Sequence, residues 1–200
     1  MVEKQVELEL VRSAKDGDAA SFEELVKLHQ KRVYNLALRM SGNPEDALDL
    51  SQEVFLRIYK ALPLFKEQSA FSTWVYSIAS NVCIDFVRKR NKLKTVSLSP
   101  DSETDSSVPE IPDNRYHPEL EYEKTELRES IAAGLSTLSD EHREILVLRE
   151  ICGLSYQEIC DALDLEGGTV KSRLSRARNQ LCVFLRNMPV KNTSKKEKGR

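Results

Sequence analysis

Residues 155–178 read SYQEICDALDLEGGTVKSRLSRAR, and this segment is the most informative part of the chain. It begins with an S-x-x-E capping box, Ser155 with Glu158, which predicts the start of a helix because each side chain caps a backbone N–H group of the other residue. That helix is expected to end at Leu163. A tight turn is expected over residues 164–168, because two adjacent glycines let the chain bend where side chains would clash. The stretch therefore predicts a helix-turn-helix.

The second helix of this motif, expected from Thr169, has an apolar stripe on one side and a basic face on the other. Such a face suits the major groove of DNA, where arginine binds guanine edges bidentately. A solvated basic helix on an unrelated bundle is the alternative. The stripe recurs at three- and four-residue intervals (Val170, Leu174, Ala177, Leu181 and Leu185), and the other face carries Lys171, Ser172, Arg173, Ser175, Arg176 and Arg178.

Charges are segregated along the chain, although the formal net charge is only −2. Residues 88–94 form a basic run, and residues 191–200 form another. Between them, residues 95–123 hold eight acids against a single arginine. A near-neutral total therefore does not argue against nucleic-acid binding, because the local fields govern it.

Targeting and metal-binding signals are missing from the sequence. No apolar run approaches the roughly 20 residues of a membrane-spanning helix, and no signal peptide is recognisable, so a soluble cytoplasmic protein is expected. The cysteines form no C-x-x-C pair and the three histidines are scattered, so no metal and no cofactor is expected. The four cysteines lie among apolar neighbours and are expected to be buried core residues: Cys83, Cys152, Cys160 and Cys182.

Helical periodicity runs through most of the chain, and strand-like alternation is nearly absent, so an all-α fold is expected. Ser21 and Glu24 form a capping box that predicts the start of a helix, which should stop at the Gly42-Asn43-Pro44 sequence. Further helices are expected over residues 45–62 and about 71–92.

Two small helical domains joined by a flexible acidic linker are therefore expected. The linker has four prolines and no apolar period, so it cannot bury enough surface to fold alone. The expected boundaries are 1–94 for the first domain, 95–123 for the linker, 124–188 for the helix-turn-helix domain and 189–200 for a disordered basic tail.

Two further motifs admit more than one interpretation. In the helix expected over 45–62, Asp49, Gln52 and Glu53 lie beside an exposed Leu56, which indicates either a protein-docking strip or an ordinary solvated face. In the helix expected over 71–92, aromatic residues precede an asparagine and a basic run. Core packing explains the rings best, but stacking on single-stranded bases, worth roughly 1–3 kcal/mol each, is the alternative.

Four blocks of sequence resemble the sigma-70 family, specifically the compact extracytoplasmic-function (ECF) type that keeps two of the family's domains. The resemblance covers about residues 20–94 and 126–185. The blocks are DALDLSQEVF at 46–55, FSTW at 71–74, IASN at 78–81 and GTVKSRL at 168–174.

This resemblance implies a transcription initiation factor and not an enzyme, with core RNA polymerase, promoter DNA and an anti-sigma factor as partners, in a stress or envelope response. It implies that Asp49, Gln52 and Glu53 dock on the clamp helices of the beta-prime subunit. The residues implied at the minus-ten element are Phe65, Lys66, Ser69, Ala70, Phe71, Trp74, Asn81 and Arg88, and those at the minus-thirty-five element are Thr169, Lys171, Ser172, Arg173, Ser175 and Arg176.

The two promoter elements lie about 25 base pairs apart, or roughly 85 Å. A coil of the linker's 29 residues spans on the order of 30 Å when relaxed and about 100 Å when stretched, so it can join two domains at that spacing. At the start of the recognition helix the chain departs from the family, because Glu166 replaces a common proline.

Two other classes of protein share parts of this pattern. A stand-alone helix-turn-helix regulator would use its N-terminal domain for a ligand or for dimerisation. A DNA-processing enzyme would need a nucleophile or clustered carboxylates, and the sequence contains no such constellation.

Overall fold

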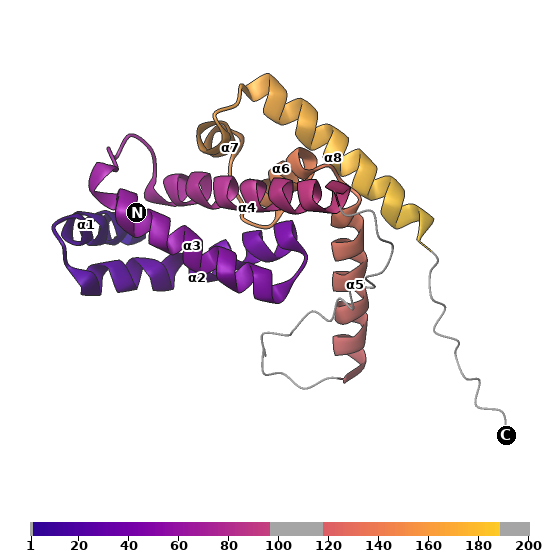
Figure 1. The fold of residues 1–200 in the computed structure, drawn as a ribbon, viewed down its shortest axis with the longest axis horizontal. Helices are drawn as coiled ribbons and strands as arrows, with labels where there is room; N and C mark the ends of the chain where they lie inside the picture. The colour runs from indigo at the N-terminus through magenta and orange to yellow at the C-terminus, as the bar shows by residue number, and fades with distance from the viewer. Residues whose placement is uncertain (1, 97–117, 189–200) are drawn as a thin grey trace.

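The computed structural model describes residues 2–96 and 118–188, and within these ranges the chain is helical with no strand. The expected all-α fold is confirmed (Figure 1). Residues 97–117 and 189–200, which hold most of the expected linker and all of the expected tail, lie outside the described residues. The elements are α1 Val2–Lys15, α2 Ala19–Ser41, α3 Pro44–Ala61, the short 3-10 turn η1 Leu62–Leu64, α4 Phe71–Val96, α5 Pro118–Ser136, α6 Asp140–Glu150, α7 Tyr156–Leu163 and α8 Gly167–Asn187.

The N-terminal helices α1 to α4 pack around α2, which contacts the other three. The apolar faces predicted by helical spacing point inward. Fully buried side chains from this group include Leu25, Val33, Leu36, Met40, Val54, Ile58 and Leu62. The long α4 crosses this group and continues past it toward the second group of helices (Figure 1).

The corner between α2 and α3 forms where the sequence predicted it. Gly42 ends α2 with φ of 74°, a left-handed conformation that glycine adopts without strain. The Asn43 side chain accepts hydrogen bonds from the backbone N–H groups of Glu45 and Asp46, and Pro44 opens the first turn of α3.

The predicted start of α2 is wrong. The helix begins at Ala19, and its N-cap is Asp18 rather than Ser21. The Asp18 carboxylate accepts hydrogen bonds from the backbone N–H groups of Ala20 and Ser21. Asp18 lies three residues before the expected cap and starts the helix earlier, because its ionised carboxylate is a stronger hydrogen-bond acceptor than a serine hydroxyl.

The C-terminal helices α5 to α8 form the second group, in which α8 packs against α5, α6 and α7. Ser139 caps α6 by accepting a hydrogen bond from the N–H of His142, as the sequence predicted. Helix α5 begins at Pro118, earlier than the helical pattern indicated. The core of this group includes Leu135, Leu138, Ile145, Leu148, Ile159 and Leu174.

The helix-turn-helix is present, with one change in its turn. The capping box of Ser155 and Glu158 is complete, and α7 ends at Leu163. The reversal takes place at Asp164, which has φ of 52°, and α8 already begins at Gly167. The prediction that the glycine pair makes the turn is therefore wrong, because aspartate also tolerates the left-handed conformation.

The two groups of helices are in direct contact, and one hydrophobic core runs through both. Helix α4 packs against α7, and α2 packs against α6 (Figure 1). Across this junction Arg143 donates a hydrogen bond to the carbonyl of Met40 at 3.1 Å, and the Asn91 amide donates to Asp140 at 3.2 Å. No pattern in the sequence predicted this contact between the domains.

The cysteines differ in environment, so the expectation of four buried thiols is wrong in part. Cys83 is buried, Cys152 and Cys160 are half-buried, and Cys182 is exposed on α8. Its neighbours on that helix are apolar in sequence, but Cys182 lines an open groove beside Leu146 and Leu181 instead of being enclosed in the core. No helix among the described residues is long and apolar enough to cross a membrane, and these residues hold no cluster of potential metal ligands.

Candidate nucleic-acid interface

Helix α8 presents the basic face that its spacing predicted. Val170, Leu174 and Ala177 are buried against the other helices of the domain. These three contacts fix the rotation of the helix about its own axis, so the opposite side must face solvent. The exposed residues of that side are Lys171, Ser172, Ser175 and Arg176, and Thr169 at the start of the helix is half-buried.

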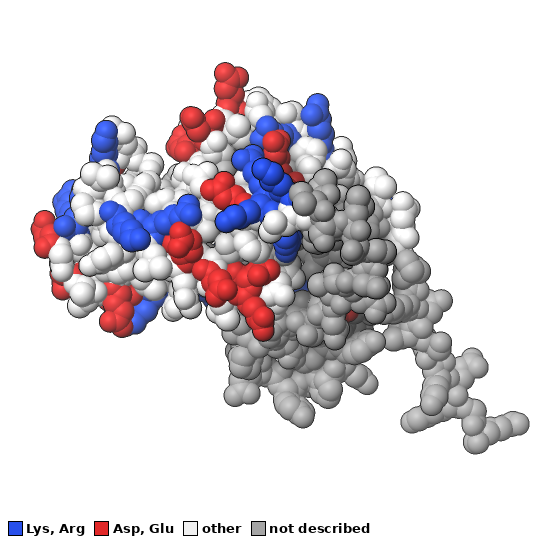
Figure 2. All heavy atoms as spheres, viewed as in Figure 1, with Lys and Arg blue, Asp and Glu red and all other residues white. Residues whose placement is uncertain are grey.

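Two arginines of α8 are held by acidic residues of α6. The Arg173 guanidinium lies 3.0 Å from the Glu141 carboxylate, and Arg178 donates to Glu150 at 2.9 Å. Ion pairs on a surface contribute little stability, so Arg173 can exchange Glu141 for a DNA group at low cost. Figure 2 shows that basic and acidic side chains are also interspersed on the face of the molecule that it draws. They do not form a single positive field there.

Aromatic residues around the start of α4 form a cluster. The ring centroids of Phe65 and Phe71 are 5.6 Å apart, and those of Phe65 and Trp74 are 4.8 Å apart. Phe65 and Phe71 are each 5% exposed, whereas Trp74 is half-buried. The structure thus places two of the three rings in the core and leaves one with an edge at the surface.

Helix α1 fixes the loop between η1 and α4, a role that sequence reasoning missed. The Lys15 ammonium donates to the Phe65 carbonyl at 2.8 Å, and the Arg12 guanidinium lies 3.2 Å from Glu67. Glu67 itself has φ of 57°. Three more of the sequence-predicted site residues border this loop: Lys66 and Ala70 are exposed, and Ser69 is half-buried.

Along α4, Trp74, Asn81 and Arg88 follow one another at intervals of seven residues. Seven residues are nearly two helical turns, so the three side chains lie in one line with steps of about 10.5 Å. Asn81 and Arg88 are exposed. The structure thus brings a ring, an amide and a cation together along a single edge of α4.

Helix α3 carries the predicted strip beside a larger apolar surface than the sequence indicated. Asp49 and Gln52 are exposed, and Glu53 is paired with Arg57 at 2.6 Å. The strip borders a groove of about 810 Å³ between α2 and α3. Among the residues that line this groove, Leu48 and Leu56 are each 55% exposed and Tyr59 is 58% exposed.

Comparison with known proteins identifies the class. A family model described as Sigma-70 region 2 matches residues 25–93, and one described as Sigma-70, region 4 matches residues 128–181, together more than half of the chain. The ECF RNA polymerase sigma factor SigW of Bacillus subtilis is 33% identical over 187 residues, covering 89% of this chain and 96% of the relative. SigE of Mycolicibacterium smegmatis is 38% identical over 172 residues, covering 84% of this chain and 64% of that longer relative.

Solved structures agree with this identification. CnrH in complex with the cytosolic domain of CnrY matches with a TM-score of 0.64 and 26% identity, covering 90% of this chain and 97% of that one. RpoE of Bartonella quintana in complex with the anti-sigma factor NepR matches with a TM-score of 0.65 and 25% identity, covering 84% of this chain and 98% of that one. The chain therefore belongs to the sigma-70 family, and within it to the ECF sigma factors. Proteins of this class are transcription initiation factors rather than enzymes.

Proposed function

We propose that this protein directs core RNA polymerase to specific promoters and helps to open them, acting in the cytoplasm as part of a stress or envelope response. The observation that supports this most is the presence of three separate surfaces on one chain: the basic face of α8, the edge of α4 and the strip on α3. A stand-alone helix-turn-helix regulator needs the first of these but has no use for the other two.

The work is divided between the domains. We assign residues 124–188 to the reading of the minus-thirty-five element as duplex, through the exposed face of α8. Its hydroxyl and guanidinium groups suit phosphates and guanine edges in a major groove. Residues 1–94 engage the minus-ten element, and the segment that begins at residue 95 and leads into α5 connects the domains.

At the minus-ten element, Trp74, Asn81 and Arg88 provide stacking, hydrogen bonding and phosphate contact in order along α4. Lys66, Ser69 and Ala70 border the same end of the helix and complete the surface. Phe65 and Phe71 belong to the site as the buried support of Trp74, because both rings are 5% exposed and in contact with each other. Flipping a base out of the duplex costs a few kcal/mol, which these contacts and the polymerase must offset.

The strip of Asp49, Gln52 and Glu53 docks on the clamp helices of the polymerase beta-prime subunit. The exposed leucines and the tyrosine of the adjoining groove add apolar area that a single charged face would lack. An anti-sigma factor is a further partner, since both structural neighbours were solved with protein partners and one of those partners is named as an anti-sigma factor.

Promoter binding requires the domains to separate. The two DNA elements lie roughly 85 Å apart, whereas α4 and α7 are packed against each other in this structure. The docked arrangement is therefore a state of the free protein, and the polymerase must hold the open one.

The test is run-off transcription with purified core polymerase on genomic fragments, followed by mapping of start sites. We expect the protein to produce new, discrete start sites. A protein that neither associates with core polymerase nor changes its start sites would contradict the proposal.

A further inference from the structure

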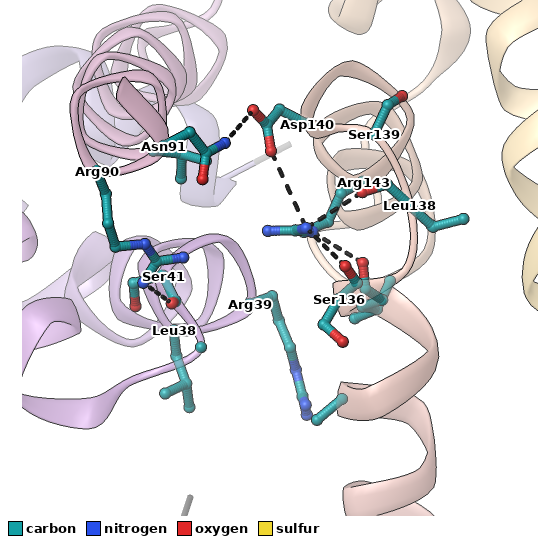
Figure 3. A pocket seen from close by; sticks show the side chains of 14 residues that line it. Leu38, Arg39, Ser41, Arg90, Asn91, Ser136, Leu138, Ser139, Asp140 and Arg143 are labelled. Carbon is teal, nitrogen blue, oxygen red and sulfur yellow. Dashed lines mark hydrogen bonds and ion pairs between the residues drawn. The ribbon is translucent and has the colours of Figure 1, made fainter. Parts of the chain in front are cut away.

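A cavity of about 530 Å³ lies at the junction between the two domains (Figure 3). Helices α2 and α4 line it from one side, and α5 and α6 line it from the other. Three of the lining residues are arginines, namely Arg39, Arg90 and Arg143, and Asp140 is the lining residue with a carboxylate. The charge on this wall is therefore positive.

Two of these arginines have unused hydrogen-bonding capacity. Arg90 donates to the carbonyl of Ser41 at 2.6 Å, but its Nε is buried without a partner, and its nearest acid, Asp46, lies 3.9 Å away. Arg39 makes no hydrogen bond or ion pair with any described residue. Burial, and after it the positive charge of Arg128, lowers the pKa of Arg39. A buried donor without an acceptor is costly, and this applies to the Arg90 Nε. Arg39 is half-buried, so its donors can reach a ligand in the cavity.

Arg143 completes the positive wall from the other domain. Its guanidinium, which is directed into the junction in Figure 3, donates to the carbonyls of Leu135, Ser136 and Leu138 and of Met40. These carbonyl oxygens accept hydrogen bonds from the Arg143 guanidinium but do not neutralise its positive charge. Its nearest carboxylate, that of Asp140, is 4.0 Å away and also accepts a hydrogen bond from Asn91.

We propose that this cavity binds a small polyanion that carries adjacent phosphate groups, in the class of nucleoside diphosphates and triphosphates. Planar guanidinium groups pair with phosphate oxygens through two parallel hydrogen bonds, and pockets of about 300–1,000 Å³ hold ligands of this size. The ligand pairs with Arg39 through hydrogen bonds, and the charges of Arg90 of the first domain and Arg143 of the second, whose own hydrogen bonds go to carbonyls, attract it to the junction. It therefore stabilises the docked arrangement.

Promoter DNA is not the ligand of this cavity. The cavity exists because the domains are docked, and binding to both promoter elements pulls them apart. This exclusion rests on the proposed function. The binding itself does not, since it concerns the protein in the absence of polymerase and DNA.

Isothermal titration of the full chain with inorganic pyrophosphate tests the proposal. We expect saturable binding with one site and a rise in melting temperature. Arg39→Gln should weaken binding by about tenfold or more, because it removes a charged donor. The fold should tolerate this change, since Arg39 forms no hydrogen bond with the described residues. Arg39→Lys should restore part of the affinity, because it restores the charge without the planar geometry.

Arg186→Gln is the control, because Arg186 is an exposed arginine of α8 that lies outside this cavity but lines a neighbouring groove together with Arg39. It should bind pyrophosphate as the unaltered protein does. Absence of pyrophosphate binding at millimolar concentration would overturn the assignment, as would equal losses in Arg39→Gln and Arg186→Gln. A loss in Arg176→Gln without a loss in Arg39→Gln would place the anion on α8 and would overturn it as well.

Discussion

Glu144 is an acid in the interface between the two domains, and it is 8% exposed. Burial raises the pKa of this carboxyl to about 7, and the Ser80 hydroxyl and the charges of Arg88 and Arg173 reduce the rise, while Glu141 adds to it. Ser80 and Arg88 belong to α4, so the proton on Glu144 responds to the contact between the domains. At neutral pH this carboxyl is close to the midpoint of its titration.

The docked arrangement should lose stability as the pH rises from about 4.5 to about 7. Below that window the carboxyl is protonated whether docked or exposed, so docking carries no penalty. Within the window the exposed carboxyl ionises while the buried one resists, and the full loss, about 3 kcal/mol, persists above it. Urea unfolding at pH 5 and at pH 8 measures this change in the free energy of unfolding. Glu144→Gln should flatten the dependence, and an unchanged slope would contradict the assignment to Glu144.

At the scale of single elements, helix starts and surfaces depend on few side chains. The N-cap of α2 is Asp18, whose carboxylate also accepts a hydrogen bond from the Ser21 hydroxyl. An ion pair with the same spacing as the one in the proposed docking strip on α3 is present on α2. Both helices carry a glutamate paired with a basic residue four positions later, Glu53 with Arg57 and Glu23 with Lys27.

Asp18→Ala should lower the free energy of unfolding measurably, because two backbone N–H groups lose their acceptor. Ser21→Ala should cost clearly less, since the Ser21 side chain does not cap the helix. Chemical denaturation of both variants makes the comparison. A larger loss of unfolding free energy in the serine variant would contradict this assignment and would support Ser21 as the N-cap.

Glu53→Arg should weaken binding to core polymerase by about tenfold or more, since it places a positive charge in the centre of the docking strip. Glu23→Arg is the matched control, because it removes a surface ion pair of the same spacing from another helix. Affinity for core polymerase, measured by fluorescence anisotropy, distinguishes the two. Equal effects would show that surface charge in general, rather than the strip, determines binding.

At the scale of the whole molecule, the free protein should be docked and the polymerase-bound protein open. Labels on Cys182 and on an introduced Leu28→Cys, with Cys152 and Cys160 replaced by serine, report the distance between the domains. Both positions are exposed, Leu28 by 54%. Energy transfer should fall when core polymerase and promoter are added. Constant transfer in an actively transcribing complex would contradict domain separation.

Features with a local cause were predictable from the sequence. The capping box of Ser155, the break at Gly42 and the buried stripe of α8 each depend on residues within a turn or two, and the structure confirms them. The contact of Arg143 with Met40 was not predictable, because no periodicity links residues 103 positions apart. The burial of Phe65 likewise depends on neighbours that local spacing does not reveal, whereas core packing was the favoured interpretation for Phe71 and its burial confirms it.

The anchoring of the loop before α4 by α1 has a practical consequence. Lys15 and Arg12 hold that loop from α1, so any substitution or cleavage that displaces α1 also acts on the segment beside Trp74. A change of start-site choice in a variant with an altered α1 would then report the position of this loop as well as the altered residue.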